Sequence, residues 1–305
     1  MEAVSQTERS LWTFTGLSGV EMGDDSEVQL PDGFLLSAKT PQLSAALDEG
    51  YMGSIQRMWW TPRLDAFFCL RSGYSLPRNR EIERFQDGLM ALQIIKPVRA
   101  LGLIFQAYDY SGNFSHVSVQ ERPQMSAGDW AELRRFDAKF IAQLPELMPM
   151  VLARMGEGSA EERNAVILLQ LSLEHFHPLI KGLFAVMGMD ALLHMKPGEG
   201  RNDFKRKLCE RLGGSTLVFP DWNSPTIAPP ACAIADVALD LYTLRSKIAH
   251  GVDLRKAAQD RNAPVDLTRG VELIEQLEPR PYASLLSEVA VYILCLVLQK
   301  ELQRT

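Results

Sequence analysis

An arginine and a histidine lie close together near the end of one apolar stretch of the sequence. Arg245 and His250 fall in the segment LYTLRSKIAHG, which spans residues 241–251. Arginine offers a planar fork of hydrogen-bond donors that matches a phosphate group, and histidine can accept or release a proton near neutral pH. Cleavage of an RNA phosphodiester bond requires these two abilities. The pair is therefore the first candidate for chemistry.

The residues before this pair predict the helix that carries it. Apolar residues from Val237 to Ile248 recur at helical spacing and form one stripe. At about 100° per residue, Arg245 lies roughly 65° from the middle of the stripe and His250 roughly 155° from it. Ser246 and the small Ala249 lie on the helix surface between them, so we expect a pocket floored by Ala249 with the pair on its two sides.

The same residues have a plain structural interpretation. A glycine such as Gly251 commonly follows a helix, and a histidine in the last turn is favoured by the helix dipole. Arg245 can be a solvated surface arginine, because an arginine and a histidine at this spacing occur by chance in many helical proteins. Spacing alone leaves open a helical bundle in which Arg245 and His250 are structural.

The segment LYTLRSKIAHG also resembles the C-terminal signature of the HEPN superfamily, and in particular its Apea-like branch. The mark of that superfamily is an arginine, a short spacer and a histidine, and this branch favours the form lRskiaHG. Glu174 falls where such proteins carry an acidic residue on a long helix, and RNDFKRKLCERL matches their middle helix. The resemblance covers about Ala160 to Val252. It implies an all-α, HEPN-like helical bundle.

The resemblance also implies a function: metal-independent RNA cleavage without a cofactor, often in antiviral defence or in toxin-like systems. His250 would move the proton and Arg245 would hold the phosphate, while Ser246 would supply a hydrogen bond. One chain has only one such histidine for two proton transfers, so a homodimer with a site shared by two subunits is expected. Many active members carry Asn, Asp or His after the arginine, where this chain has Ser246. The alternative is a non-catalytic scaffold that dimerises and binds RNA or a nucleotide.

Other charged residues are candidates for supporting roles. Glu174 lies in an otherwise apolar run, and a buried carboxylate needs a partner, so we expect it to pair with Arg245. Basic residues near the motif are candidate RNA contacts, although such residues usually form a solvated face; they are Lys205, Arg206, Lys207 and Lys247.

A metal site is not expected. His175 and His177 would point about 200° apart on one helix, and no cluster of carboxylates or cysteines completes a site around them. No Gly-rich phosphate loop, nucleophile elbow or kinase signature is present in the sequence.

Composition bounds the remaining possibilities. The chain has 305 residues, of which 46% are hydrophobic and 23% charged, as in an ordinary soluble protein. A net charge of -6 argues against a surface that coats polyanions. The four cysteines are far apart, and the longest apolar run, Val289 to Leu298, is about half of what a bilayer requires. We therefore expect a cytoplasmic protein without a membrane partner.

The N-terminal part, residues 1–125, predicts an antiparallel β-rich recognition domain whose ligand the sequence does not identify. Apolar and polar residues alternate in several short runs, and Pro31-Asp32-Gly33 predicts a turn between two of them. Short helices are expected near Pro41 to Glu49 and near Arg80 to Leu92. A binding platform of adjacent aromatic residues is a further hypothesis; its residues are Trp59, Trp60, Phe67 and Phe68.

The remainder, residues 126–305, predicts an all-α domain, so the fold class is α+β. Pro145 and Pro149 are expected to interrupt an early helix. Ser159 and Glu162 predict a capping box for a run that is apolar nearly all round and is expected in the bundle centre. A break is expected at Pro178, and later helices at Asn202 to Leu212, Asp266 to Leu277 and Tyr282 to Gln303.

Overall fold

The computed structural model describes residues 10–22, 27–49, 64–73, 78–110, 113–121, 137–175, 178–216, 218, 233–250 and 282–302. The described residues form two compact units. The first draws on Met1–Gln93, Val98–Ser126 and Arg135–Leu152, and the second on Ile94–Pro97, Ala127–Arg134 and Ala153–Thr305. The predicted boundary between residues 125 and 126 lies outside the described residues.

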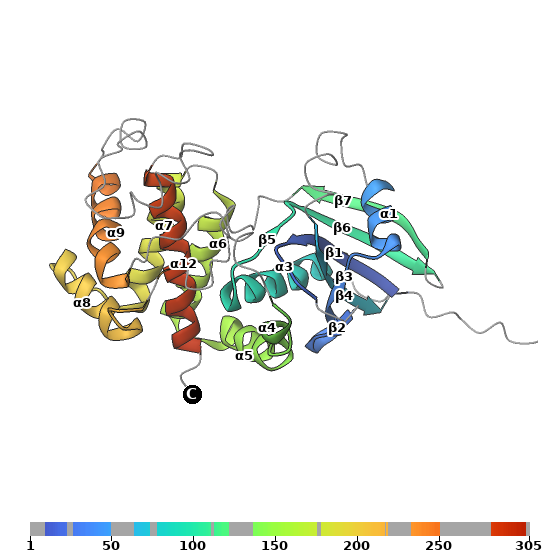
Figure 1. Cartoon of the computed structure of the whole chain (residues 1–305), viewed down its shortest axis with the longest axis horizontal. Coiled ribbons are helices and arrows are strands. Elements are labelled where there is room, and N and C mark those ends of the chain that lie inside the picture. The colour runs from blue at the N-terminus through green and yellow to red at the C-terminus, as the bar shows by residue number, and fades with distance from the viewer. Residues whose placement is uncertain are drawn as a thin grey trace, which may run out of the picture. The chain divides into compact units, whose positions relative to one another are not determined.

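The first unit contains an antiparallel sheet and the C-terminal region is mainly helical, so the α+β fold class is confirmed (Figure 1). The strands follow the order β2-β3-β4-β1-β6-β7, and β5 pairs with β1 at one end. Their bounds are Ser10–Ser18 for β1, Glu27–Gln29 for β2, Phe34–Ala38 for β3, Ala66–Gly73 for β4, Arg99–Ala100 for β5, Leu103–Tyr110 for β6 and Asn113–Glu121 for β7.

The turn between β2 and β3 forms where the sequence predicts it. Pro31–Gly33 makes a single turn of 3-10 helix, with Asp32 at φ 59° and Gly33 at φ 81°. A side chain at Gly33 would place its first carbon 2.5 Å from the backbone oxygen of Arg71. Glycine is therefore required there both by the positive φ and by the close approach of β4.

Helices cover both faces of the sheet. Phe67 and Phe68 are neighbours on β4 and therefore point to opposite faces. Phe67 packs in a core with Leu43 and Leu47 of α1 (Pro41–Glu49), and Phe68 packs with Phe85 of α3 (Arg78–Ile95). Both predicted helices are confirmed, and α3 continues to Ile95, past the predicted end at Leu92.

The hypothesis of an aromatic platform is wrong for its β4 residues. Phe67 and Phe68 are completely buried because each face of the sheet is covered. Trp59 and Trp60 lie outside the described residues.

The helix α5 (Leu144–Glu157), preceded by the short α4 (Ala138–Ile141), corrects a second expectation. Pro149 does not interrupt it but lies inside it, and Pro145 is in its first turn. A proline near the helix start costs little because the first N–H groups have no partner within the helix. This accounts for Pro145 but not for Pro149, which lies beyond the first turn and leaves one backbone carbonyl of the helix without its usual donor.

The helices of the second unit match most of the predicted segments. Their bounds are Ala160–Glu174 for α6, Pro178–Leu192 for α7, Arg201–Leu212 for α8, Ile234–Ala249 for α9 and Tyr282–Leu302 for α12. The predicted break at Pro178 is confirmed, since α6 ends before it and α7 begins with it. The predicted helix at Asp266 to Leu277 lies outside the described residues.

The capping box at the start of α6 is confirmed. The Ser159 hydroxyl accepts from the Glu162 backbone N–H at 3.2 Å, and the Glu162 carboxylate accepts from the Ser159 N–H at 2.6 Å. The expectation that α6 lies in the bundle centre is wrong, because Ile167 and Leu171 are 54% and 38% exposed. The central element is α12, which packs against α6, α7, α8 and α9 and runs beside α7 (Figure 1).

Gly182 is the point where α7 approaches both α9 and α12. A methyl carbon there would lie 2.7 Å from Leu244 Cδ2 and 2.8 Å from Ser287 Oγ. Leu244 directly precedes Arg245 on α9. Close packing at Gly182 therefore fixes the helix that carries the candidate pair.

We expect Gly182→Ala to lower the free energy of unfolding by about 1–3 kcal/mol, because overpacking forces the helices apart. The control is Gly156→Ala in α5, where the new methyl carbon meets nothing within 4 Å and the gain in helix propensity is up to about 1 kcal/mol. Urea denaturation measures both. Equal stability of the two variants would contradict the packing at Gly182.

Every helix among the described residues is too short or too polar to cross a lipid bilayer.

Candidate functional site

The helix α9 presents Arg245, Ser246 and His250 near its C-terminal end. Val237 and Leu241 of the apolar stripe are completely buried, as the helical spacing predicts. Arg245 and Ser246 are half-buried, and His250 is exposed. The helix ends at Ala249, and the His250 N–H caps it by donating to the Ser246 backbone oxygen at 3.0 Å.

The surface between the pair differs from the expected pocket. Ala249 is exposed and forms no floor. The His250 side chain makes no hydrogen bond or ion pair with a described residue, and Gly251 lies outside them. Arg245 and His250 therefore lie at the same end of α9, and no described residue is bonded to the His250 ring.

Two contacts hold the Arg245 guanidinium. Its Nε forms an ion pair with Asp190 Oδ2 of α7 at 2.7 Å. Its central carbon lies 5.4 Å from the centre of the Tyr242 ring, one turn earlier on α9, at a distance typical of a cation–π contact. The Arg245 side chain remains 36% exposed. An arginine anchored through Nε keeps its two terminal nitrogens for an incoming anion.

Asp190 is an unusual anchor because it is mostly buried. Burial raises the pKa of its carboxyl group from 3.8 to about 6, and the neighbouring Arg245 offsets only part of that rise. Its Oδ1 is inaccessible and has no hydrogen-bond partner among the described residues. The charge that holds Arg245 therefore changes close to neutral pH.

The predicted pairing of Glu174 with Arg245 is wrong. Glu174 is the last residue of α6, and its Oε1 accepts from Gln170 Nε2 at 2.9 Å. The helix that packs against α9 and supplies the carboxylate is α7. Asp190 also lies in an apolar helical run, so it was as good a candidate for the buried carboxylate as Glu174.

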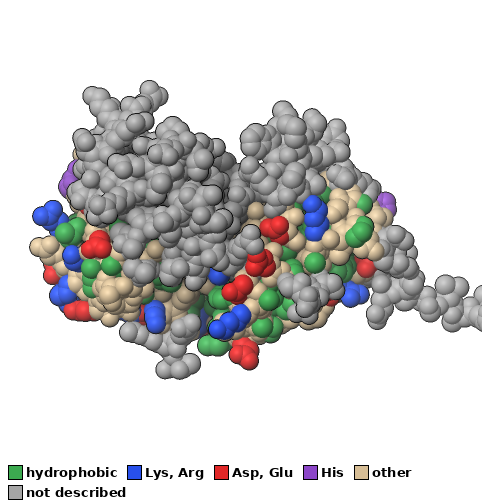
Figure 2. All heavy atoms as spheres, viewed as in Figure 1, with side chains coloured by type: hydrophobic (Ala, Val, Ile, Leu, Met, Phe, Trp, Pro, Cys, Tyr) green, Lys and Arg blue, Asp and Glu red, His purple; other side chains and the backbone are tan. Residues whose placement is uncertain are grey.

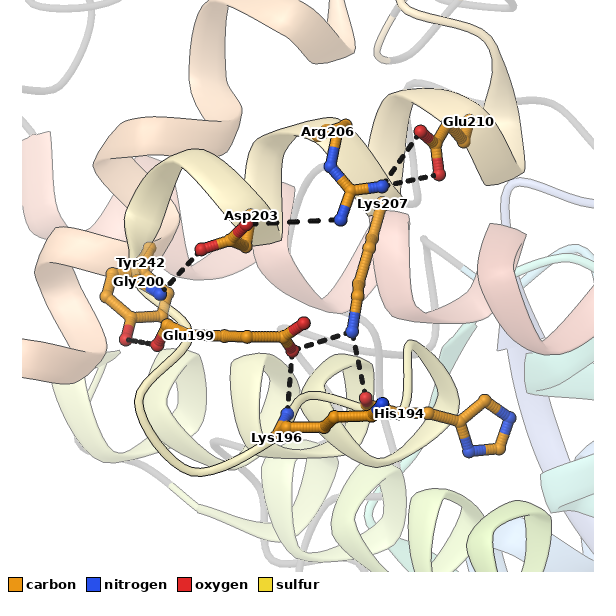
Figure 3. A network of polar contacts seen from close by, with 9 residues as sticks. All are labelled: His194, Lys196, Glu199, Gly200, Asp203, Arg206, Lys207, Glu210 and Tyr242. Atoms are coloured by element: carbon orange, nitrogen blue, oxygen red, sulfur yellow. Dashed lines mark hydrogen bonds and ion pairs between the residues drawn. The ribbon is translucent and has the colours of Figure 1, made fainter.

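The basic residues of α8 are engaged with acidic neighbours. Arg206 pairs with Glu210 at 3.0 Å and lies 3.9 Å from Asp203. Lys207 points the other way, to Glu199 at 2.6 Å (Figure 3). Lys205 is half-buried and forms no ion pair with a described residue. The side chain of Lys247 is not among the described parts of the structure.

Basic and acidic side chains are mixed on the described surface. Figure 2 shows Lys and Arg side chains interspersed with Asp and Glu on the face in view, rather than gathered into one basic patch. The four candidate RNA contacts therefore stay predictions, with Lys205 the one α8 candidate that no ion pair to a described residue neutralises.

Within the described ranges, no group of three or more His, Cys, Asp or Glu side chains is placed to hold a metal ion. His175 caps the end of α6 and packs against the ring of Phe184 at 5.9 Å. Its predicted counterpart His177 lies outside the described residues.

Comparisons with known proteins identify no relative of the chain. No family model matches the sequence, no curated protein matches it, and no solved structure matches the fold.

Proposed function

We propose that the protein is an endoribonuclease of the HEPN type, which cleaves RNA without a metal ion. The observation that carries the proposal is the arrangement of Arg245: a half-exposed guanidinium, anchored through Nε, on the helix that ends at His250. The resemblance of LYTLRSKIAHG to the superfamily signature supports the same function. No cofactor is part of the proposal.

In the proposed mechanism, His250 removes the proton from a ribose 2′-hydroxyl. The 2′-oxygen forms a bond to phosphorus while the bond to the 5′-oxygen breaks, and a protonated group supplies a proton to that leaving oxygen. Arg245 offsets the charge that develops on the phosphate oxygens. The Ser246 hydroxyl is placed on the same helix turn and supplies a further hydrogen bond.

A homodimer completes this chemistry. Two proton transfers need two titrating groups, and a two-fold axis near the end of α9 would bring a second His250 to the site. The exposed position of His250 suits such a shared site. A cytoplasmic location and a role in antiviral defence or a toxin-like system belong to the proposal through the resemblance alone.

The second candidate function is a non-catalytic scaffold that dimerises and binds RNA or a nucleotide. One observation favours it: the His250 side chain has no described partner to hold its ring in a reactive orientation. Ser246 favours it too, because many active members of the superfamily carry Asn, Asp or His there.

An RNA mixture incubated with the purified protein in EDTA separates the two candidates. We expect wild-type protein to shorten the RNA and to sediment as a dimer. The scaffold instead predicts a retarded protein–RNA complex with RNA of unchanged length. Cleavage that requires added Mg²⁺ would contradict the proposed mechanism.

A further inference from the structure

Tyr242 of α9 lies beside the loop between α7 and α8. Its hydroxyl donates to the backbone oxygen of Glu199 at 3.3 Å. Its ring packs against Phe204 of α8, with ring centres 5.6 Å apart. The guanidinium of Arg245 also contacts the ring, with its central carbon 5.4 Å from the ring centre. Tyr242 therefore joins the loop and α8 to the residue proposed to hold the phosphate.

Lys207 fixes the loop to which Tyr242 is bonded. Its Nζ donates to Glu199 Oε2 at 2.6 Å and to the backbone oxygen of His194 at 2.9 Å. The backbone N–H of Lys196 donates to the same Glu199 oxygen at 2.7 Å. Figure 3 shows these bonds drawing both ends of the loop toward one lysine. The Glu199 carbonyl accepts the hydrogen bond from the Tyr242 hydroxyl, and it therefore lies on a loop whose two ends are held together.

The geometry points to Tyr242, supported by the Lys207–Glu199 ion pair, as a positioning residue for Arg245. The ion pair between Nε and Asp190 does not by itself fix the direction of the guanidinium. Contact with the Tyr242 ring restricts its rotation and favours one direction for the two terminal nitrogens. The effect of Tyr242 on catalysis rests on the proposed function. In-line attack requires the phosphate to be held in one orientation, and the direction of the Arg245 nitrogens sets that orientation.

The adjacent basic residues Arg206 and Lys207 have different contacts. Lys207 acts through Glu199 and Tyr242, whereas Arg206 forms an exposed pair with Glu210 on its own helix. Removing either side chain changes the net charge by the same amount on the same helix. Arg206 is therefore a matched control for Lys207.

The test observes Arg245 directly in the full-length protein, by NMR of its Nε–H group. Absence of the signal in Arg245→Lys assigns it. We expect Tyr242→Leu to remove the ring-current shift of this signal and to speed its exchange with solvent by about fivefold, the factor for loss of one cation–π contact. Tyr242→Phe keeps the ring and should retain the shift. Lys207→Met should also speed the exchange, and Arg206→Met should not.

Two results would overturn the inference: an Arg245 signal unchanged in Tyr242→Leu, or equal exchange rates in Lys207→Met and Arg206→Met. If Tyr242→Leu does not fold, the lysine and arginine variants decide. RNA cleavage in EDTA is the second readout, in which kcat should fall in Lys207→Met while KM stays constant. Absence of cleavage by wild type would count against the proposed function, and the NMR signal would still decide the positioning role.

Discussion

Replacing Arg245 with lysine is expected to lower the rate of RNA cleavage by about 100-fold or more, the usual effect of losing one group that stabilises transition-state charge. Lysine keeps the positive charge but has one nitrogen. That nitrogen cannot bind Asp190 and a phosphate oxygen in the way that the arginine Nε and terminal nitrogens can. The measurement is the initial rate in EDTA at saturating RNA.

The control is Arg201→Lys at the start of α8. Arg201 is exposed and is not among the candidate RNA contacts, so its replacement should leave the rate nearly unchanged. Similar rates for the two variants would show that charge alone matters at residue 245. The proposed orientation of the guanidinium would then be wrong.

The second large effect is expected in the pH dependence of stability. The pKa of Asp190 is raised from 3.8 to about 6 in the folded protein, so the folded state favours the protonated carboxyl group. The stability that this preference contributes is fully present below the ordinary pKa and is lost as the pH rises through 6. For a shift of about two pH units, the loss is about 3 kcal/mol.

Asp190→Asn should remove this component, because asparagine is neutral at every pH. Its free energy of unfolding should therefore vary less between about pH 4 and pH 7 than that of the wild type. The control is Glu174→Gln, which alters a carboxylate that contacts Gln170 and not Arg245. Urea denaturation at several pH values measures both. Parallel pH profiles for wild type and Asp190→Asn would contradict the burial of a charged Asp190.

Local patterns in the sequence were sufficient for most elements of the fold. The capping box of Ser159 and Glu162, the break at Pro178 and the turn at Gly33 depend on neighbours within a few residues, and the structure forms each of them. The apolar stripe of α9 was equally informative, because helical spacing alone decides which side is buried.

Contacts between distant segments were harder to predict. The partner of Arg245 depends on which helix packs against α9, and helical spacing does not indicate which helix that is. Glu174 and Asp190 are both carboxylates in apolar runs, and the sequence offered no reason to prefer the second. Tyr242 was missed although it lies three residues before Arg245, where helix geometry places it on a neighbouring position.

Burial was also mispredicted where it depends on neighbouring elements. The run of α6 is apolar on nearly all sides, yet Ile167 and Leu171 are exposed because the other helices cover only part of it. Phe67 and Phe68 show the opposite effect, since helices on both faces of the sheet bury both rings.

The most direct measurement is the chemical identity of the RNA ends that wild type and His250→Ala produce in EDTA. Attack by the ribose 2′-hydroxyl predicts 2′,3′-cyclic phosphate and 5′-hydroxyl ends, formed about 100-fold or more slowly by His250→Ala. Wild-type ends that carry 3′-hydroxyl and 5′-phosphate groups would mean that water attacks the phosphate. That result, or an unchanged rate in His250→Ala with intact folding and dimerisation, would contradict Arg245 and His250 as the catalytic pair.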